Sequence, residues 1–207
     1  MKESPIPFKG DMVRAVLSGQ KTQTRRPMKP IPVYPDAFGG LRREIHDGQV
    51  HFWASGAELP AHKFRCPYGQ PGDRLWVRER WAADMSFDDL PPRMLPPRGM
   101  PIYYHATAQC MDYKWRPSIH MPRWASRITL EITDIRVERV QNIHEEDAIA
   151  EGIDPRKLSY LSGERAVTKF SVLWNSIYAA DGLGWDINPW VLVIAFKRVV
   201  KKECQKN

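Results

Sequence analysis

The sequence predicts an α+β fold, in which a small barrel or strongly curved sheet carries its helices on the outside. Two stretches predict strands, because apolar residues alternate over 127–140 and residues 190–196 form an uninterrupted apolar run. Two other stretches, near the two ends of the chain, have the apolar spacing of helices. Proline accounts for 18 of the 207 residues. Since proline interrupts helices and central strands, this content indicates long ordered loops and a β-rich architecture.

The first expected element is a helix over residues 11–17. Asp11 is suited to cap its start, and Gly19 is suited to end it. The apolar stripe of this helix consists of Met12, Val13, Val16 and Leu17. The polar segment GQKTQTRRP that follows has no apolar period, so we expect a basic loop that Pro27 closes.

The middle of the chain is expected to consist mainly of loops. Residues 28–66 are rich in Pro, Gly and His without a sustained period, which predicts an irregular excursion with one strand at 49–53. A strand is expected over 74–78, after a Gly-Asp turn. The proline-rich segment 84–101 predicts a loop or flap, and residues 102–106 predict another short strand.

The last third of the chain carries the clearest pattern. Over 127–140 the apolar alternation changes phase near Thr133, which predicts a β-bulge or tight turn. Residues 145–151 predict a short helix with an acidic first turn, as the helix dipole favours. A longer helix is expected over 164–178, and residues 190–198 predict a strand that is buried on both faces.

Charge and composition narrow the function classes. The chain has 31 Lys and Arg against 24 Asp and Glu, a net charge of +7, together with eight tryptophans. Cations neutralise phosphates and aromatic faces stack on bases, so this composition suits a nucleic-acid partner. It suits an ordinary basic enzyme equally well.

The sequence also argues against a membrane-spanning protein, a secreted protein and a fold held by disulfides. The longest apolar run has seven residues, whereas a bilayer span needs roughly 20. The first residues, MKESPIPFKGDM, lack the apolar stretch of a secretory signal, so we expect a cytoplasmic protein with no membrane partner. Three widely spaced cysteines argue against a disulfide framework.

Four segments in order resemble one family. They are SGQKTQTRR (18–26), PGDRLWVRE (71–79), ITLEIT followed by IHEEDAIAEGI (143–153), and the helix around Phe170 and Trp174 that leads to NPWVLVIAF. Each is weak alone, but together they span nearly the whole chain and resemble the ASCH domain. That family has a small β-barrel related to the PUA domains that bind RNA, so the resemblance implies a PUA-like barrel and an RNA-related role.

Two further segments resemble a longer ASCH group that is common in bacteriophages and prophages. They are CPYGQPGD and WRPSIHMPRWASR (115–127). Compared with compact members of the family, this chain has long irregular insertions at about 28–65 and 82–114. The sequence therefore predicts a single ASCH-type domain over residues 1–200 and a basic tail over 201–207.

One compact ASCH branch removes the acetyl group from N4-acetylcytidine, and its site motif is similar here. The match implies catalytic roles for Lys21, Thr24 and Glu151. A threonine hydroxyl needs a base to take its proton, and a lysine can be that base only when its pKa falls toward neutrality. Partial burial and the neighbouring Arg25 and Arg26 would lower the pKa of Lys21. Arg26 matches the family's arginine and would stabilise an oxyanion or hold a phosphate.

Two rival functions stay open at this stage: a non-enzymatic RNA-binding module with the same pocket, and a ribonuclease. Another carboxylate, Glu79, shares the core side of its strand with Leu75 and Val77, and is interpreted first as a structural ion pair.

The segment 115–127 contains no acid and is the second candidate site. Arg116 and Arg123 are predicted to contact phosphates, and Trp124 is predicted to stack on a base. Core packing is the alternative explanation for its tryptophans. Ser118 and His120 lack a third partner for a catalytic triad.

No metal and no cofactor are expected. The candidate ligands have spacings unlike a zinc site, and they are His46, His51, His62 and Cys66.

Overall fold

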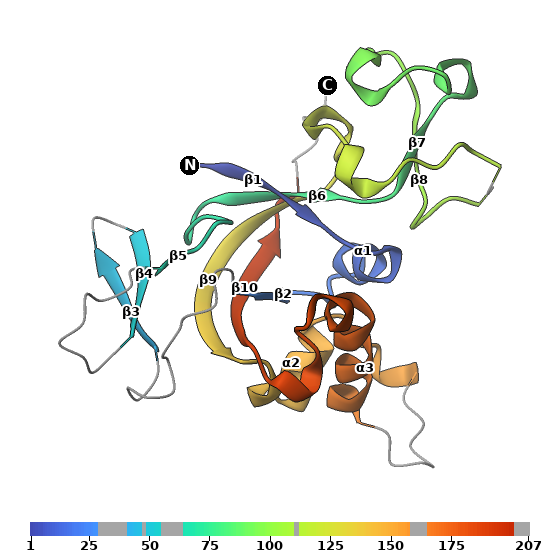
Figure 1. The fold of residues 1–207 in the computed structure, drawn as a ribbon. Coiled ribbons are helices and arrows are strands. Elements are labelled where there is room, and N and C mark those ends of the chain that lie inside the picture. The colour runs from blue at the N-terminus through green and yellow to red at the C-terminus, as the bar shows by residue number, and fades with distance from the viewer. Residues whose placement is uncertain (29–40, 47–48, 55–63, 110–111, 158–164, 201–207) are drawn as a thin grey trace, which may run out of the picture.

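The computed structural model describes residues 1–28, 41–46, 49–54, 64–109, 112–157 and 165–200 (Figure 1). Helices and strands are mixed along the chain, so the predicted α+β class is confirmed. The predicted basic tail, residues 201–207, lies outside the described residues.

A five-stranded sheet forms the centre of the molecule. Its strands are β1 (Glu3–Pro7), β2 (Gln23–Pro27), β6 (Arg74–Arg78), β9 (Thr129–Arg139) and β10 (Trp190–Arg198). Their order across the sheet is β1-β6-β9-β10-β2, and only the β1–β6 pair is parallel. The long strands β9 and β10 curve strongly around the centre (Figure 1). The predicted curved sheet with outer helices is therefore present, and closure into a barrel stays a prediction.

The predicted bulge in β9 is confirmed at Thr133. In the ladder with β10, Asp134 lies opposite Ala195 and Ile132 lies opposite Phe196, so Thr133 has no partner. An extra residue in one strand bends that strand and increases its twist. The change of phase seen in the sequence is thus the sign of a bend in the sheet.

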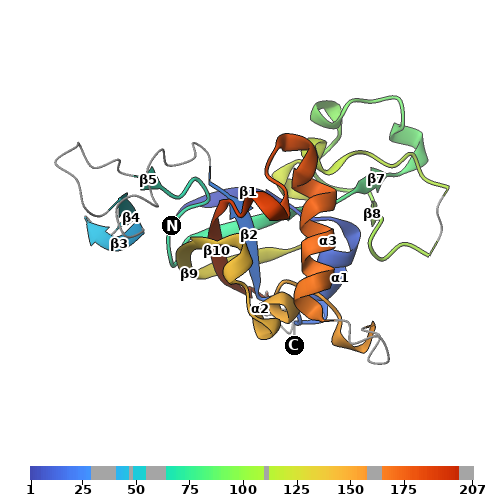
Figure 2. The same cartoon turned by 60° about the horizontal axis from the view of Figure 1, so that its bottom comes forward.

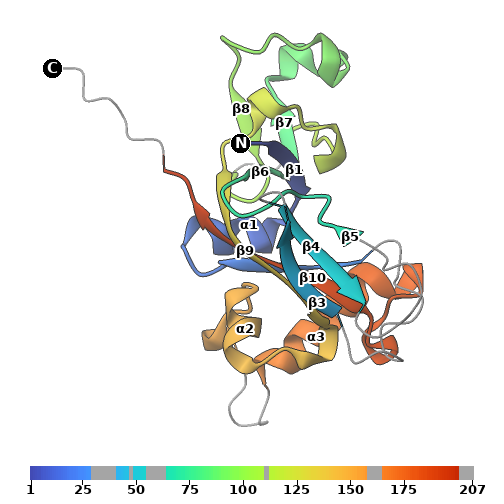
Figure 3. The same cartoon turned by 90° about the vertical axis from the view of Figure 1, so that its left-hand side faces the viewer.

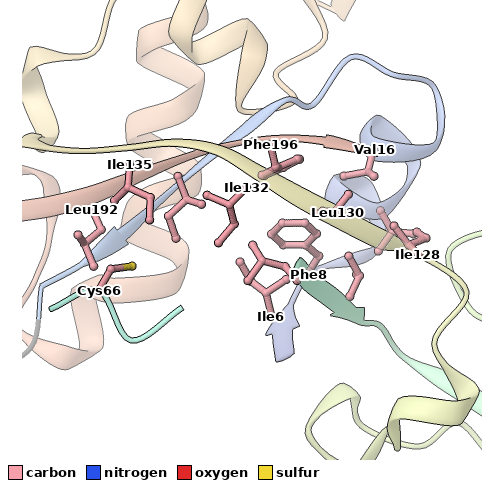
Figure 4. Close-up of a cluster of buried hydrophobic side chains, with 14 of the residues drawn as sticks. Ile6, Phe8, Val16, Cys66, Ile128, Leu130, Ile132, Ile135, Leu192 and Phe196 are labelled. Carbon is pink, nitrogen blue, oxygen red and sulfur yellow. The ribbon is translucent and has the colours of Figure 1, made fainter. Parts of the chain in front are cut away.

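The main core lies inside the curve of the sheet (Figure 4). Alternate residues of β9 and β10 point into it, and Ile6 and Phe8 reach it from the start of the chain. The other buried members shown there include Val16, Cys66, Ile128, Leu130, Ile132, Ile135, Leu192 and Phe196. Burying apolar area is worth about 25 cal/mol per Å², so this cluster is the main source of stability.

Three α-helices are found among the described residues (Figure 2). They are α1 (Gly10–Leu17), α2 (Glu145–Ala150) and α3 (Ala166–Tyr178). Val13 and Val16 of α1 pack into the main core, whereas α2 and α3 pack on the outer face of the sheet. The outward side chains of β10, among them Val193, pack with Phe170 and Trp174 of α3 in a second core. In the described part of the chain, no helix has the length and apolar character needed to cross a bilayer.

The start of α1 differs from the expectation. Lys9, not Asp11, occupies the N-cap position, and it makes no side-chain cap. Asp11 lies in the first turn and pairs with Arg14. Gly19 does follow the helix end, with a φ of 80° that glycine adopts at little cost, so the predicted stop is confirmed.

The predicted basic loop GQKTQTRRP is in part a strand, which corrects the sequence interpretation. Residues Gln23–Pro27 form β2, which pairs with β10 along its full length. Polar side chains that are satisfied by ion pairs replace apolar ones on one face of β2. The strand therefore shows no apolar alternation.

Two small units project from the central sheet (Figure 3). The first is a three-stranded sheet of β3 (Leu41–His46), β4 (Gln49–Ala54) and β5 (Phe64–Arg65), where the sequence predicted a single strand in an irregular excursion. The second is the hairpin of β7 (Trp81–Ala83) and β8 (Ile102–Tyr104). Between β7 and β8 there are only short 3-10 helices, so the predicted loop is confirmed.

Candidate functional site

The site forms where the turn between α1 and β2 meets the end of α2. The Lys21 amide donates to the carbonyl of Ala15, and the Thr22 amide donates to the carbonyl of Ala150 at 2.9 Å. These backbone bonds anchor the turn on both helices. They bring Lys21 beside Glu151, the residue that ends α2.

The Lys21 and Glu151 side chains form a buried ion pair. Lys21 Nζ donates to Glu151 Oε2 at 2.9 Å and to the carbonyl oxygen of Glu151 at 2.6 Å. The two side chains are 0% and 4% exposed. Removing two charges from water costs several kcal/mol per ion, which only close pairing and further hydrogen bonds offset. Two residues that the family resemblance links are therefore in direct contact.

Arg25 completes the pair from the other side of the carboxylate. Its Nη1 donates to Glu151 Oε1 at 3.2 Å, and its remaining donors bind Glu138 and Asp147. Gln23, two residues earlier on the same face of β2, donates to Asp147 at 2.8 Å. The sequence interpretation assigned Arg25 only an effect on the pKa of Lys21. Side chains alternate between the two faces of a strand, so residues 23 and 25 would lie on the same face. The sequence did not predict this strand, because the segment has no apolar alternation.

The environment of Lys21 shifts its pKa in opposing directions. Burial lowers the pKa of Lys21 below its ordinary value, and the charges of Arg26 and Arg25 lower it further. The Glu151 carboxylate acts against this, through its charge and its hydrogen bond. Burial is the largest of these causes, so the net direction is the one that a general base requires.

Thr24 and Arg26 lie on the opposite face of β2 from Arg25. Thr24 pairs with Ile194 of β10, whose side chain belongs to the main core, and Thr24 is itself buried. Arg26 donates to the Tyr178 hydroxyl at 3.1 Å and to the Pro7 carbonyl at 2.7 Å. Among the described residues, Arg26 therefore makes no hydrogen bond with Glu151, and Arg25 occupies that place.

The ring of Phe8 connects these groups. The Lys21 Nζ atom lies 5.4 Å from the ring centroid, and the Arg26 Cζ atom lies 5.6 Å from it. Lys21 and Arg26 thus lie around one aromatic ring of the main core. A cation at such a distance from an aromatic face gains about 0.5–2 kcal/mol.

Gly152 sets the position of the Lys21 stem. Its φ is 100°, and a Cβ added there would lie 3.5 Å from Lys21 Cβ and 3.0 Å from Ala15 Cβ. A side chain at Gly152 would combine a strained backbone with a close contact. The turn after α2 therefore packs directly on the lysine.

The segment 115–127 is held by contacts within the protein. Arg116 donates to the backbone carbonyls of Phe87 and Leu90, at 2.9 and 2.8 Å. Arg123 pairs with Glu3 at 2.8 Å. The edge of Trp124 meets Trp81, and Trp124 is 36% exposed. These contacts account for the three side chains structurally, and the predicted RNA contact stays a prediction.

The structural interpretation of Glu79 is confirmed. Both of its oxygens accept from Arg127, at 2.9 and 3.0 Å, and its side chain is buried. Within the described ranges no three His, Cys, Asp or Glu residues are grouped to hold a metal ion. His62 and the side chains of His46 and His51 lie outside the description.

A groove runs along the outside of the site between α1 and α3. Its volume is about 890 Å³, and Glu151 and Gly152 form part of its lining. The α1 residues Met12 and Ala15 form one wall. The opposite wall consists of Lys169, Val172, Leu173 and Ser176 of α3.

Comparisons with known proteins found similarity only to solved structures. No family model matches the chain, and no curated protein matches it. Among solved structures, the chain is similar to an ASCH domain from Lactobacillus crispatus JV V101, at 12% identity and a TM-score of 0.39, over 95% of this chain and 79% of that one. It is also similar to a DUF984 protein from Enterococcus faecalis V583, at 10% identity and a TM-score of 0.42, over 100% and 86% of the two chains. At such values the likeness assigns neither a family nor an activity.

Proposed function

We propose that the chain is an ASCH-type, PUA-like protein that acts on RNA or modified nucleosides and hydrolyses the N4-acyl amide of cytidine. The expected products from N4-acetylcytidine are cytidine and acetate. The observation that carries the proposal is the buried contact of 2.9 Å between Lys21 and Glu151, with Thr24 three residues along the chain on the adjoining strand. The resemblance of four segments to the ASCH domain supports the fold of the proposal, and the similar site motif at Lys21, Thr24 and Glu151 supports the activity.

The first half of the proposed reaction needs a neutral lysine. Burial favours loss of the Lys21 ammonium proton to solvent, which leaves a neutral amine hydrogen-bonded to the Glu151 carboxylate. Lys21 Nζ then accepts the proton of the Thr24 hydroxyl as the hydroxyl oxygen attacks the acetyl carbonyl carbon. When the C–N bond breaks, this proton passes from Lys21 to Glu151 Oε2 and from there to the leaving N4 amino group. Cytidine leaves, and the acetyl group stays on Thr24 as an ester.

Water completes the second half. Lys21, neutral again, accepts a proton from water as the water oxygen attacks the ester carbonyl. Lys21 then gives this proton to the Thr24 oxygen as the ester bond breaks, and the acetic acid loses its own proton to solvent. Acetate, the free Thr24 hydroxyl and neutral Lys21 result. Arg25, which holds Oε1 at 3.2 Å, positions the carboxyl group throughout. Arg26 lies on the Thr24 side of the strand, where its guanidinium can stabilise the negative carbonyl oxygen.

One observation favours a second candidate, a non-enzymatic RNA-binding module. Lys21 and Glu151 are sealed from solvent and hydrogen-bonded to each other, as in a purely structural pair. In that case the motif stabilises the turn between α1 and β2, and the protein binds RNA by surface charge alone.

Product analysis separates these candidates. The protein is incubated with N4-acetylcytidine and, separately, with labelled RNA, and the products are identified by mass spectrometry. Thr24→Val removes the hydroxyl that the proposal requires, whereas Thr22→Val makes the same change at an exposed neighbour. Cytidine formation that Thr24→Val abolishes and Thr22→Val retains supports the amidohydrolase. Shortened RNA would indicate a ribonuclease, and unchanged substrates with retained RNA binding would support the binding module.

A further inference from the structure

The groove between α1 and α3 is larger than a free nucleoside substrate would need. Its volume of about 890 Å³ lies near the upper end of the range of small-molecule sites, about 300–1,000 Å³. Its lining comes from α1, from α3 and from the turn at Glu151 and Gly152. The inferred ligand is therefore longer than the group that reacts.

The charge of the groove favours an anion. Lys9, Arg14, Arg156 and Lys169 line it, and Asp11 and Asp154 are the acids there besides Glu151. Glu151 is already paired inside the protein with Lys21 and Arg25. The exposed Lys9 has a neutral neighbour, since its Nζ atom donates to Ser176 Oγ at 3.5 Å. Arg14 pairs with Asp11 and Arg156 pairs with Asp154, so Lys9 and Lys169 supply the excess positive charge of the groove.

An apolar strip runs between these cations. Val172 of α3 is 66% exposed, and Leu173 and Met12 line the groove beside it. No aromatic residue in the described part of the chain lines the groove, so bases would bury apolar area on these aliphatic side chains rather than stack on rings. Phosphates would meet the cations, so a single strand of nucleic acid matches both properties. An acidic protein segment is the competing occupant, and the test below includes it.

The groove adjoins the proposed site at Gly152. Gly152 lines the groove on its outer side and packs against the Lys21 side chain on its inner side. A strand that follows α1 and α3 would therefore bring one of its nucleotides to the turn that carries Glu151.

We propose that this groove binds the phosphate backbone of single-stranded RNA, so that the substrate of the Lys21–Glu151 site is an acetylated cytidine within a strand. This inference rests on the proposed function for the reaction, but the binding of RNA in the groove can be measured without it.

The test compares two charge reversals of equal size. Lys9→Glu with Arg156→Glu changes two exposed cations of the groove, and Arg93→Glu with Arg98→Glu changes two exposed cations in the β7–β8 segment. Binding of a fluorescein-labelled 12-nucleotide RNA is measured by anisotropy at several salt concentrations, and thermal unfolding verifies that each variant is folded. We expect the groove variant to lose at least tenfold in affinity. Its dependence of log K on log salt should become shallower by about 1.4, or 0.7 for each lost phosphate contact.

Two outcomes would overturn the inference. Equal losses in both variants would show unspecific attraction by net charge, and unchanged RNA binding with loss of binding to a poly-glutamate peptide would identify an acidic protein partner. If the unmutated protein hydrolyses both substrates, the groove variant should also lose tenfold in the ratio of kcat/KM for an acetylated strand to that for free N4-acetylcytidine. If it hydrolyses neither, the proposed function fails, while the anisotropy still decides on the groove.

Discussion

Lys21 and Glu151, 130 residues apart in the sequence, form a buried ion pair in which the lysine donates to both the side chain and the backbone of the glutamate. The contact joins the turn after α1 to the end of α2. Arg25 binds the other carboxylate oxygen, so both oxygens of Glu151 are engaged. Without Glu151 the buried Lys21 would lose the carboxylate that it pairs with, and without Lys21 the buried Glu151 would keep Arg25 as its cation.

This dependence predicts a strong coupling in stability. Lys21→Met should lower the free energy of unfolding by about 3–5 kcal/mol, because it removes one partner of a buried pair. Adding Glu151→Gln should restore part of that loss, and urea unfolding of the two single variants and the double variant measures the coupling. Lys114→Met is the control, since the contact of Lys114 with Asp89 is exposed at 3.6 Å and should contribute little. Additive effects of the first two substitutions would contradict the prediction.

The rate of amide hydrolysis should rise with pH. Only the neutral amine of Lys21 accepts a proton, and burial lowers the pKa of Lys21, so the rise should occur below the reference value of about 10.4. The pH dependence of kcat/KM for N4-acetylcytidine reports this pKa in the free enzyme. A rate that stays constant or falls over the range in which the protein is folded would exclude lysine as the base.

Conservative substitutions should separate the roles of the two motif residues. Lys21→Arg keeps the positive charge but cannot accept a proton, so turnover should be lost while substrate binding is retained. Thr24→Ser keeps a hydroxyl and should retain measurable activity. Thermal unfolding of each variant, measured beside product formation, distinguishes a chemical effect from loss of the fold. Full activity of the Lys21→Arg variant would contradict the proposed mechanism.

The Glu79–Arg127 pair predicts a stability change that depends on pH. Burial raises the pKa of Glu79, and its contacts with Arg127 lower it. Arg127→Met removes the lowering contacts, so the pKa should rise further. At low pH the protonated Glu79 carries no charge and the loss of stability is small. The loss should grow as pH rises from the ordinary carboxyl pKa of the unfolded chain toward the raised pKa of the folded variant, because the unfolded chain releases the proton first. It should reach about 3–5 kcal/mol at pH 7.

Urea unfolding at pH 5 and pH 7 measures this difference. Glu79→Gln combined with Arg127→Met should remove most of the pH dependence, because no ionisable group is left at that position. A loss that is equal at both pH values would contradict the assignment to Glu79.

Arg116 and Arg123 should respond differently to truncation. Arg116→Ala removes hydrogen bonds to the carbonyls of Phe87 and Leu90, so limited proteolysis should cut faster between these residues. Arg123→Ala removes an exposed cation and should weaken RNA binding, with a salt dependence that is shallower by about 0.7. An unchanged salt dependence would mean that this part of the 115–127 segment does not contact phosphates.

The sequence predicted the longer strands with apolar alternation or apolar runs, because such patterns record burial directly. It therefore placed β6, β9 with its bulge, and β10 correctly. It missed the short strands β1 and β7, although both bury apolar residues. It also missed β2, where buried polar groups such as Gln23 and Arg25 replace apolar ones, and two strands of the β3–β5 sheet. Pairing with a distant strand, rather than local composition, decides such cases.

The candidate site was likewise predicted from the sequence only in part. From its sequence alone, the chain was expected to bring Lys21, Thr24 and Glu151 together, and to use Arg26 as the cation of the site. Pairing of β2 with β10 places Arg25 toward α2 and Arg26 toward the core, so Arg25 binds Glu151. Residue types and their spacing are properties of the sequence and specify which chemistry is available. The side of a strand that each residue occupies depends on the register with a partner about 170 residues away and on the layers that cover the two faces, and only the tertiary structure decides it.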